Sequence, residues 1–184
     1  MRKNTHAVIA CAWLAASMLN SAAADPPKTV SAVVVPDSIK VPATEAFSFA
    51  ATAKGVQIYE CRAKKDDLAR FEWVFKAPEA ELFDRDGKRI GKHYAGPTWE
   101  SNDGSKVLGE LKARADAEDT NAIPWLLLGV RKHEGEGVFS KVTSIQRVDT
   151  VGGKAPAGGC ESATAGKEIS VPYSATYYFY VAKP

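Results

Sequence analysis

The chain has 184 residues, a length that suits one domain with a sizeable hydrophobic core. It carries 24 lysines and arginines against 22 aspartates and glutamates, and the whole excess lies in Arg2 and Lys3 near its start. The remainder is formally neutral, which gives no electrostatic basis for binding nucleic acid or an anionic membrane surface, so we expect neither partner.

Residues 1–24 have the three parts of a secretory signal peptide. The two basic residues are followed by an apolar stretch from Ala7 to Leu19 and by the small residues Ala22 to Ala24. A membrane-spanning helix needs about 20 apolar residues, whereas this stretch ends at Asn20. We therefore expect cleavage before Asp25, a periplasmic or secreted protein, and no membrane insertion after cleavage.

The rest of the chain divides into an extended lead-in over residues 25–44 and a single β domain over residues 45–184. Residues 33–35 of the lead-in can form a short edge strand. The domain contains short segments in which apolar and polar side chains alternate, as they do in half-buried strands. The expected strands cover residues 45–54, 56–62, 71–76, 88–101, 105–117, 138–150 and 169–181, and residues 123–130 form either a buried strand or a docked core segment.

Turn signals separate these segments. Gly55 is expected to turn the chain, and the Asp-Gly pairs within residues 84–87 and 102–105 favour hairpin turns. Gly96 and Pro97 interrupt the strand predicted over residues 88–101.

Two segments are ambiguous. Residues 77–82 can form a turn of helix or the entry to another strand. Residues 105–117 also match a helical pattern, but Gly109 favours a strand. With few helix signals, the sequence predicts an all-β fold with little helix, a single-domain antiparallel β-sandwich or barrel.

The number of cysteines in the exported protein depends on cleavage of the signal peptide. Its cleavage removes Cys11 and leaves Cys61 and Cys160. In an oxidising compartment one disulfide is their simplest use, with two buried thiols or a reactive thiol as alternatives. A bridge closing a loop of about 100 residues contributes about 4–5 kcal/mol in the chain-entropy model. Neither cysteine has a second ligand at metal-binding spacing, so no metal is expected on this pair.

The segment from His93 to Ser105 gathers the groups best able to do chemistry. Its Gly-Pro bend can bring His93 and Glu100 together at one rim of the sheet. His93 would then act as a general base oriented by Glu100, and the same pair with Asp103 can hold a divalent metal. The alternatives are ligand contact without chemistry and a purely structural segment.

Aromatic side chains supply the ligand-binding candidates. Tyr94 and Trp99 belong to the same segment and serve either as ligand contacts or as core aromatics. Tyrosines alternate across the predicted strand 169–181, so one face packs in the core while the other offers rings and hydroxyls, with Tyr178 as the candidate. No G-x-S-x-G motif is present, so serine hydrolysis has no support.

Several sequence blocks resemble a family of secreted bacterial and fungal proteins catalogued as a domain of unknown function. They are G-V-Q-I-Y-E-C at 55–61, H-Y-A-G-P-T-W-E at 93–100, D-G-S at 103–105, I-P-W-L-L-L at 123–128, I-Q-R-V-x-T-x-G-G at 145–153, A-P-x-G-G-C at 155–160 and V-P-Y-S-A-x-Y-x-F-Y at 171–180. The resemblance covers nearly the whole chain after the signal but implies no chemistry.

Two hypotheses of function follow. The first is a non-enzymatic exported β domain that binds a small ligand, an envelope polymer or a protein partner, with no cofactor. The second is a small exported enzyme, hydrolytic or metal-assisted, built on His93, Glu100 and Asp103.

Overall fold

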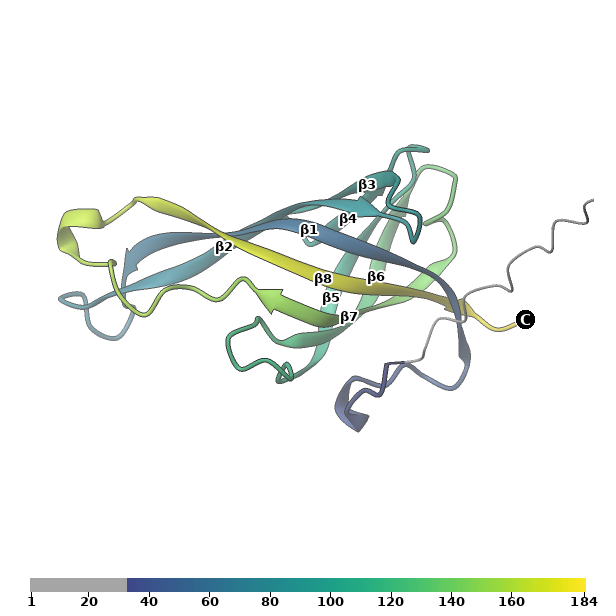
Figure 1. The fold of residues 1–184 in the computed structure, drawn as a ribbon, viewed down its shortest axis with the longest axis horizontal. Coiled ribbons are helices and arrows are strands. Elements are labelled where there is room, and N and C mark those ends of the chain that lie inside the picture. Colours follow the sequence, from purple (N-terminus) through teal and green to yellow (C-terminus); the bar gives the residue numbers. More distant parts are fainter. Residues whose placement is uncertain (1–32) are drawn as a thin grey trace, which may run out of the picture. The chain divides into compact units, whose positions relative to one another are not determined.

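The computed structural model describes residues 33–184, so the predicted signal peptide, its cleavage site and the start of the lead-in lie outside the described residues. Within residues 33–184, eight antiparallel strands form one sheet that closes as a barrel (Figure 1). The all-β prediction is confirmed, and the barrel is the architecture observed. The strands are β1 (Glu45–Ala63), β2 (Phe71–Phe83), β3 (Arg89–Tyr94), β4 (Thr98–Ser101), β5 (Lys106–Ala115), β6 (Trp125–Glu134), β7 (Val142–Gly152) and β8 (Glu168–Ala182).

Helix is limited to two short 3-10 turns, η1 (Asp37–Ile39) and η2 (Ser162–Thr164). Among residues 33–184 we find no helix with the length and hydropathy needed to cross a membrane.

The barrel closes through β8, which pairs with β1 over almost its whole length. Side chains alternate along β8, and Ala175, Tyr177 and Phe179 all lie in the main core cluster. Ala51 and Ala53 of β1 belong to the same cluster. The core is therefore the interior of the barrel, filled by one face of every long strand.

Gly55 does not turn the chain as predicted, because residues 45–63 form one continuous strand. Here β1 and β2 approach so closely that a Cβ atom on residue 55 would lie 2.1 Å from the carbonyl oxygen of Glu79. A side chain would force the two backbones apart, so the glycine permits a close approach of strands.

The predicted turns at residues 84–87 and 102–105 connect β2 to β3 and β4 to β5. Gly96 and Pro97, joined by a cis peptide bond, separate β3 from β4. Residues 77–82 continue β2, and most of the segment 105–117 forms β5. Both ambiguous segments are therefore strands.

Three strands continue beyond the closed ring. The β2–β3 ladder ends at Ala80, and the β7–β8 ladder ends at Tyr173. β1 keeps both of its neighbours as far as Glu60. We call the resulting three-stranded extension, residues 56–63, 71–79 and 168–172, the arm. Figure 1 shows β1, β2 and β8 running past the other strands.

Cys61 and Cys160 form the predicted disulfide, with Cα atoms 5.3 Å apart. The bond joins the arm to the long loop between β7 and β8. Two side-chain hydrogen bonds hold the same loop: the Tyr59 hydroxyl donates to the Gly153 carbonyl at 2.6 Å, and Trp73 Nε1 donates to the Gly158 carbonyl at 2.9 Å. The loop is thus fixed to the arm at three points.

The described part of the lead-in covers the outside of the barrel, and no edge strand forms at residues 33–35. Ile39 of η1 is fully buried, and its carbonyl accepts a hydrogen bond from Gln146 Nε2 at 2.8 Å. The outer cluster consists of Ile39, Trp125, Val148 and Tyr178. Because of this cover, the middle of β7 and of β8, around Val148 and Tyr178, is buried on both faces.

Candidate functional site

A cavity of about 280 Å³ lies inside the barrel, at the place where the arm leaves the ring. All eight strands contribute to its wall, and we call it the inner cavity. Its polar wall residues include Gln57, His93, Trp99, Arg147 and Tyr177, and its apolar ones include Phe75, Pro78, Pro97, Leu111, Leu126 and Leu128.

Strand alternation places the polar residues inside. Arg147 is two residues from Ile145, a fully buried core residue, and lies opposite Tyr177 of β8. Gln57 lies four residues after Ala53 on β1, and therefore on the same inward face. These side chains are distant in the sequence and meet only because the sheet closes.

The wall contains buried polar atoms that no described residue satisfies. Gln57 Nε2, Trp99 Nε1 and the Tyr177 hydroxyl make no hydrogen bond of good geometry, although none of the three residues is more than 2 % exposed. The Tyr177 hydroxyl does lie near the Tyr173 hydroxyl and the Arg147 guanidinium. The Tyr173 hydroxyl, on the same face of β8, also makes no such bond. Each such group costs about 1–3 kcal/mol. Native proteins keep few of them, so this concentration makes the inner cavity the candidate functional site.

Burial raises the pKa of Tyr177 and of Tyr173. Both hydroxyls therefore keep their protons at neutral pH and can donate hydrogen bonds.

His93 stands in the wall as a neutral ring. It is 3 % exposed, stacks on Trp99 with ring centroids 4.3 Å apart, and meets the Tyr177 ring edge-on at 5.2 Å. Its Nδ1 lies 2.8 Å from the Thr98 carbonyl oxygen, which can only accept, so Nδ1 carries the proton. Burial lowers the pKa of His93 to about 3, so at neutral pH the ring is an uncharged, weak base.

The bend expected at Gly96 and Pro97 forms, but it does not bring His93 and Glu100 together. His93 pairs with Trp99 across the β3–β4 hairpin, so Glu100 points to the opposite, outer face. There the Tyr94 hydroxyl donates to Glu100 at 2.7 Å, and Lys92 Nζ lies 3.4 Å away. The hydrogen bond from Tyr94 lowers the pKa of Glu100 and raises that of Tyr94 to about 12.

Asp103 is occupied in joining two loops. Its carboxylate accepts hydrogen bonds from the Ser105 hydroxyl at 2.6 Å and from the Val138 backbone N–H at 2.8 Å. These bonds, the one from Ser105 first, lower the pKa of Asp103 to about 2. Over residues 33–184 we find no group of three side chains able to hold a metal ion, so His93, Glu100 and Asp103 do not assemble into one.

The aromatic candidates separate in the same way. Trp99 lines the inner cavity, whereas Tyr94 lies outside with Glu100 and Tyr178 belongs to the outer cluster. The polar wall residues that sequence reasoning missed are Gln57, Lys76, Arg147 and Tyr177.

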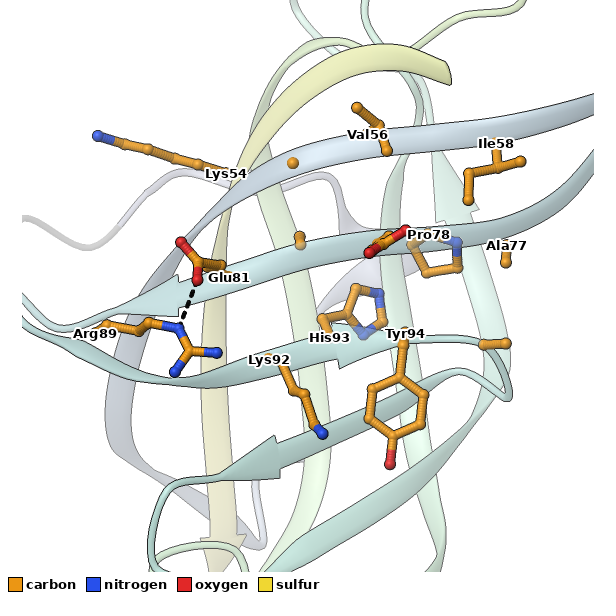
Figure 2. A pocket seen from close by; sticks show the side chains of 14 residues that line it. Lys54, Val56, Ile58, Ala77, Pro78, Glu81, Arg89, Lys92, His93 and Tyr94 are labelled. Carbon is orange, nitrogen blue, oxygen red and sulfur yellow. Dashed lines mark ion pairs between the residues drawn. The ribbon is translucent and has the colours of Figure 1, made fainter. Parts of the chain in front are cut away.

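A second, open hollow of about 800 Å³ lies outside β1, β2 and β3, and we call it the outer hollow (Figure 2). An ion pair between Arg89 and Glu81 spans β2 and β3 at 2.6 Å, and Figure 2 shows the His93 ring between the same two strands. Pro78, His93 and Ala95 line both spaces. These three residues therefore form a shared wall between the outer hollow and the inner cavity.

A family model described as "Protein of unknown function (DUF3455)" matches residues 42–181. No curated protein and no solved structure matches the chain. Because the family match covers well over half of the 184 residues, the chain belongs to this family of unknown function, and the expected membership of a domain-of-unknown-function family is confirmed.

Proposed function

We propose that this DUF3455 protein is an exported binding protein that holds a small organic ligand in its inner cavity. The observation that carries the proposal is the set of buried, unsatisfied polar atoms on Gln57, Trp99 and Tyr177 in the cavity wall. A ligand that bonded to these atoms would remove the cost of burying them. A mainly apolar pocket with a few convergent polar groups is the common form of a small-molecule site.

Two features support export. Residues 1–24 have the composition of a signal peptide, and the Cys61–Cys160 disulfide is of a kind that persists in oxidising compartments. When the full chain is expressed in a bacterial host, the osmotic-shock fraction should contain a protein with the mass of residues 25–184 and one disulfide. A cytoplasmic protein of full-length mass with free thiols would contradict export.

Binding fits the lining better than catalysis. The described residues that line the inner cavity include no serine, cysteine, aspartate or glutamate. His93 lines it, but a pKa of about 3 makes its ring a poor general base at neutral pH. The volume of about 280 Å³ suits a small molecule and not a polymer or a folded partner.

The half-exposed Phe75 and Leu111 place one side of the inner cavity at the surface, and the shared wall of Pro78, His93 and Ala95 offers a second route of entry. The β2–β3 ladder ends at the pair of Ala80 and His93, so no backbone hydrogen bonds close the sheet beyond it. A ligand held in the outer hollow would then need only side-chain movement in this wall to reach the inner cavity.

The test uses three water-soluble probes that share a benzyl group: phenylacetate, 2-phenylethanol and 2-phenylethylamine. In titrations followed by NMR, at least one should bind saturably and shift the side-chain signals of Gln57 and Trp99. Leu126→Trp fills the cavity and should abolish the shifts. Leu127→Trp, on the opposite face of β6, is the matched control and should retain them.

Leu111→Trp is a second plug, at a wall position that is already 49 % exposed and therefore tolerant of bulk. If Leu126→Trp proves unfolded, Leu111→Trp tests whether the probes bind in the inner cavity. The proposal is wrong if none of the three probes shifts the wall residues, or if the folded plug variants bind as well as the wild type does.

A further inference from the structure

The charges around the inner cavity are all of one sign. Its two charged wall residues are Lys76 and Arg147, and no carboxylate is found among the described residues that line it. Lys76 already forms an ion pair with Glu168 on β8. Arg147 forms none with any described carboxylate, although its side chain is partly buried in the barrel.

Arg147 is fixed in position by a neutral partner. Its Nε and Nη2 atoms both donate to the carbonyl oxygen of Pro124, at 3.2 and 2.7 Å. A single oxygen cannot use the five N–H donors of a guanidinium group, and a carbonyl does not neutralise its charge. Arg147 is therefore a partly buried cation without a counter-charge, and an anion placed beside it would supply one.

The unsatisfied polar groups near Arg147 also favour a ligand that accepts hydrogen bonds. Trp99 Nε1 and Gln57 Nε2 are donors only, and the protonated Tyr177 hydroxyl can donate. Tyr177 lies directly opposite Arg147 in the β7–β8 ladder. Donors from four strands therefore gather beside the cavity, and a small shift of their side chains would turn them toward a ligand group with several acceptor atoms.

We infer that the ligand is an organic anion, a carboxylate whose oxygens lie against Arg147 and Tyr177 while its apolar body lies against Leu126 and Leu128. Carboxylates match the planar fork of arginine and accept two parallel hydrogen bonds from it. This inference rests on the proposed function and names the ligand class for the same cavity. At about 30 Å³ per water molecule of liquid, the cavity has room for roughly ten non-hydrogen atoms.

Calorimetry at pH 7 with the same three probes separates the possibilities, because they differ only in charge and polar head. Phenylacetate should bind at least about tenfold more tightly than 2-phenylethanol, and the cationic 2-phenylethylamine should bind most weakly. Arg147→Gln should lower the affinity for phenylacetate to about that for the alcohol. Arg147→Lys, which keeps the charge and loses the fork, should fall between the two.

The matched control is Arg131→Gln, which removes an exposed arginine from the neighbouring strand β6 and should leave all three affinities unchanged. Equal binding of acid and alcohol by the wild type, or full binding of phenylacetate by Arg147→Gln, would overturn the anion inference while leaving a binding cavity in place. The ranking of probes in the wild type decides the question even if an Arg147 variant fails to fold. Failure of all three probes to bind would instead refute the proposed function itself.

Discussion

The two ends of the barrel interior are filled in opposite ways by the same strands. At one end Phe179 stacks on Phe49 with centroids 4.5 Å apart and contacts Phe139 at 5.1 Å, beside the fully buried Ile145. At the other end β8 supplies Tyr177 and β7 supplies Arg147, around a cavity with unsatisfied polar atoms. The apolar end stabilises the fold, whereas the polar end costs free energy and is best explained by function.

Phe179→Ala should cause the largest loss of stability. Removing this ring opens a cavity in the packed end and should lower the free energy of unfolding by about 3–5 kcal/mol in urea denaturation. Phe47→Ala removes a ring that is 46 % exposed and packs edge-on against Tyr178 on the outer face, so it should cost clearly less. Equal losses in the two variants would show that the packed end is not the main source of stability.

Replacing both bridged cysteines, as Cys61→Ala with Cys160→Ala, should lower the free energy of unfolding by about 2–5 kcal/mol. The bridge holds the long loop between β7 and β8 at the polar end, where few buried apolar side chains are available to hold it. The single-bridge wild type under non-reducing conditions is the reference. A double variant with an unchanged urea midpoint would mean that Tyr59 and Trp73 hold the loop unaided.

Acid should destabilise the polar end through His93. Its pKa is about 3 in the folded protein and about 6.5 in the unfolded chain, so between these values the unfolded chain binds the additional proton. The stability linked to His93 is complete above about pH 6.5 and should fall by about 1.4 kcal/mol per unit as the pH drops toward 3.

His93→Asn removes the titration while keeping a donor near Thr98. The difference between wild type and variant isolates His93 from the carboxylates that also titrate in acid. Urea unfolding at pH 7, 6, 5 and 4 should therefore give converging stabilities, and parallel curves would contradict the assignment.

The smallest expected effect is a change in the free energy of unfolding that has opposite signs for two tyrosine-to-phenylalanine variants. Tyr177→Phe removes a buried hydroxyl without a partner and should raise the free energy of unfolding by about 1 kcal/mol while weakening phenylacetate binding. Tyr59→Phe removes a hydroxyl that donates to Gly153 and should lower it by about 1 kcal/mol. If both variants lose stability, the Tyr177 hydroxyl has a partner in solution.

Much of the barrel could be predicted because its determinants are local. Alternation marked the strand at 169–181, and Asp-Gly pairs marked the turns at 84–87 and 102–105. Gly55 was misjudged because glycine permits both a turn and a close approach of strands, and only the position of Glu79 on the neighbouring strand decides between them.

The polar wall could not be located for a different reason. Tyr177 and Tyr178 are 1 % and 8 % exposed, because β8 is covered inside by the barrel and outside by Ile39. Alternation shows which residues share a face, but it cannot identify the inner face when both are buried. Arg147 gave no local signal, since its role depends on strands brought together by closure.

The prolines of the arm affect strand pairing between copies of this protein. Beyond the ring, the outer edges of β2 and β8 have no strand partner among residues 33–184, and such edges invite pairing between molecules. The Pro172 carbonyl points away from β1 and accepts a hydrogen bond from the Gly153 N–H at 2.9 Å. The N–H and the carbonyl of a strand residue point to the same side, so proline removes a donor from this outer edge of β8. Together with Pro78 on β2, it should limit strand pairing between copies of this protein.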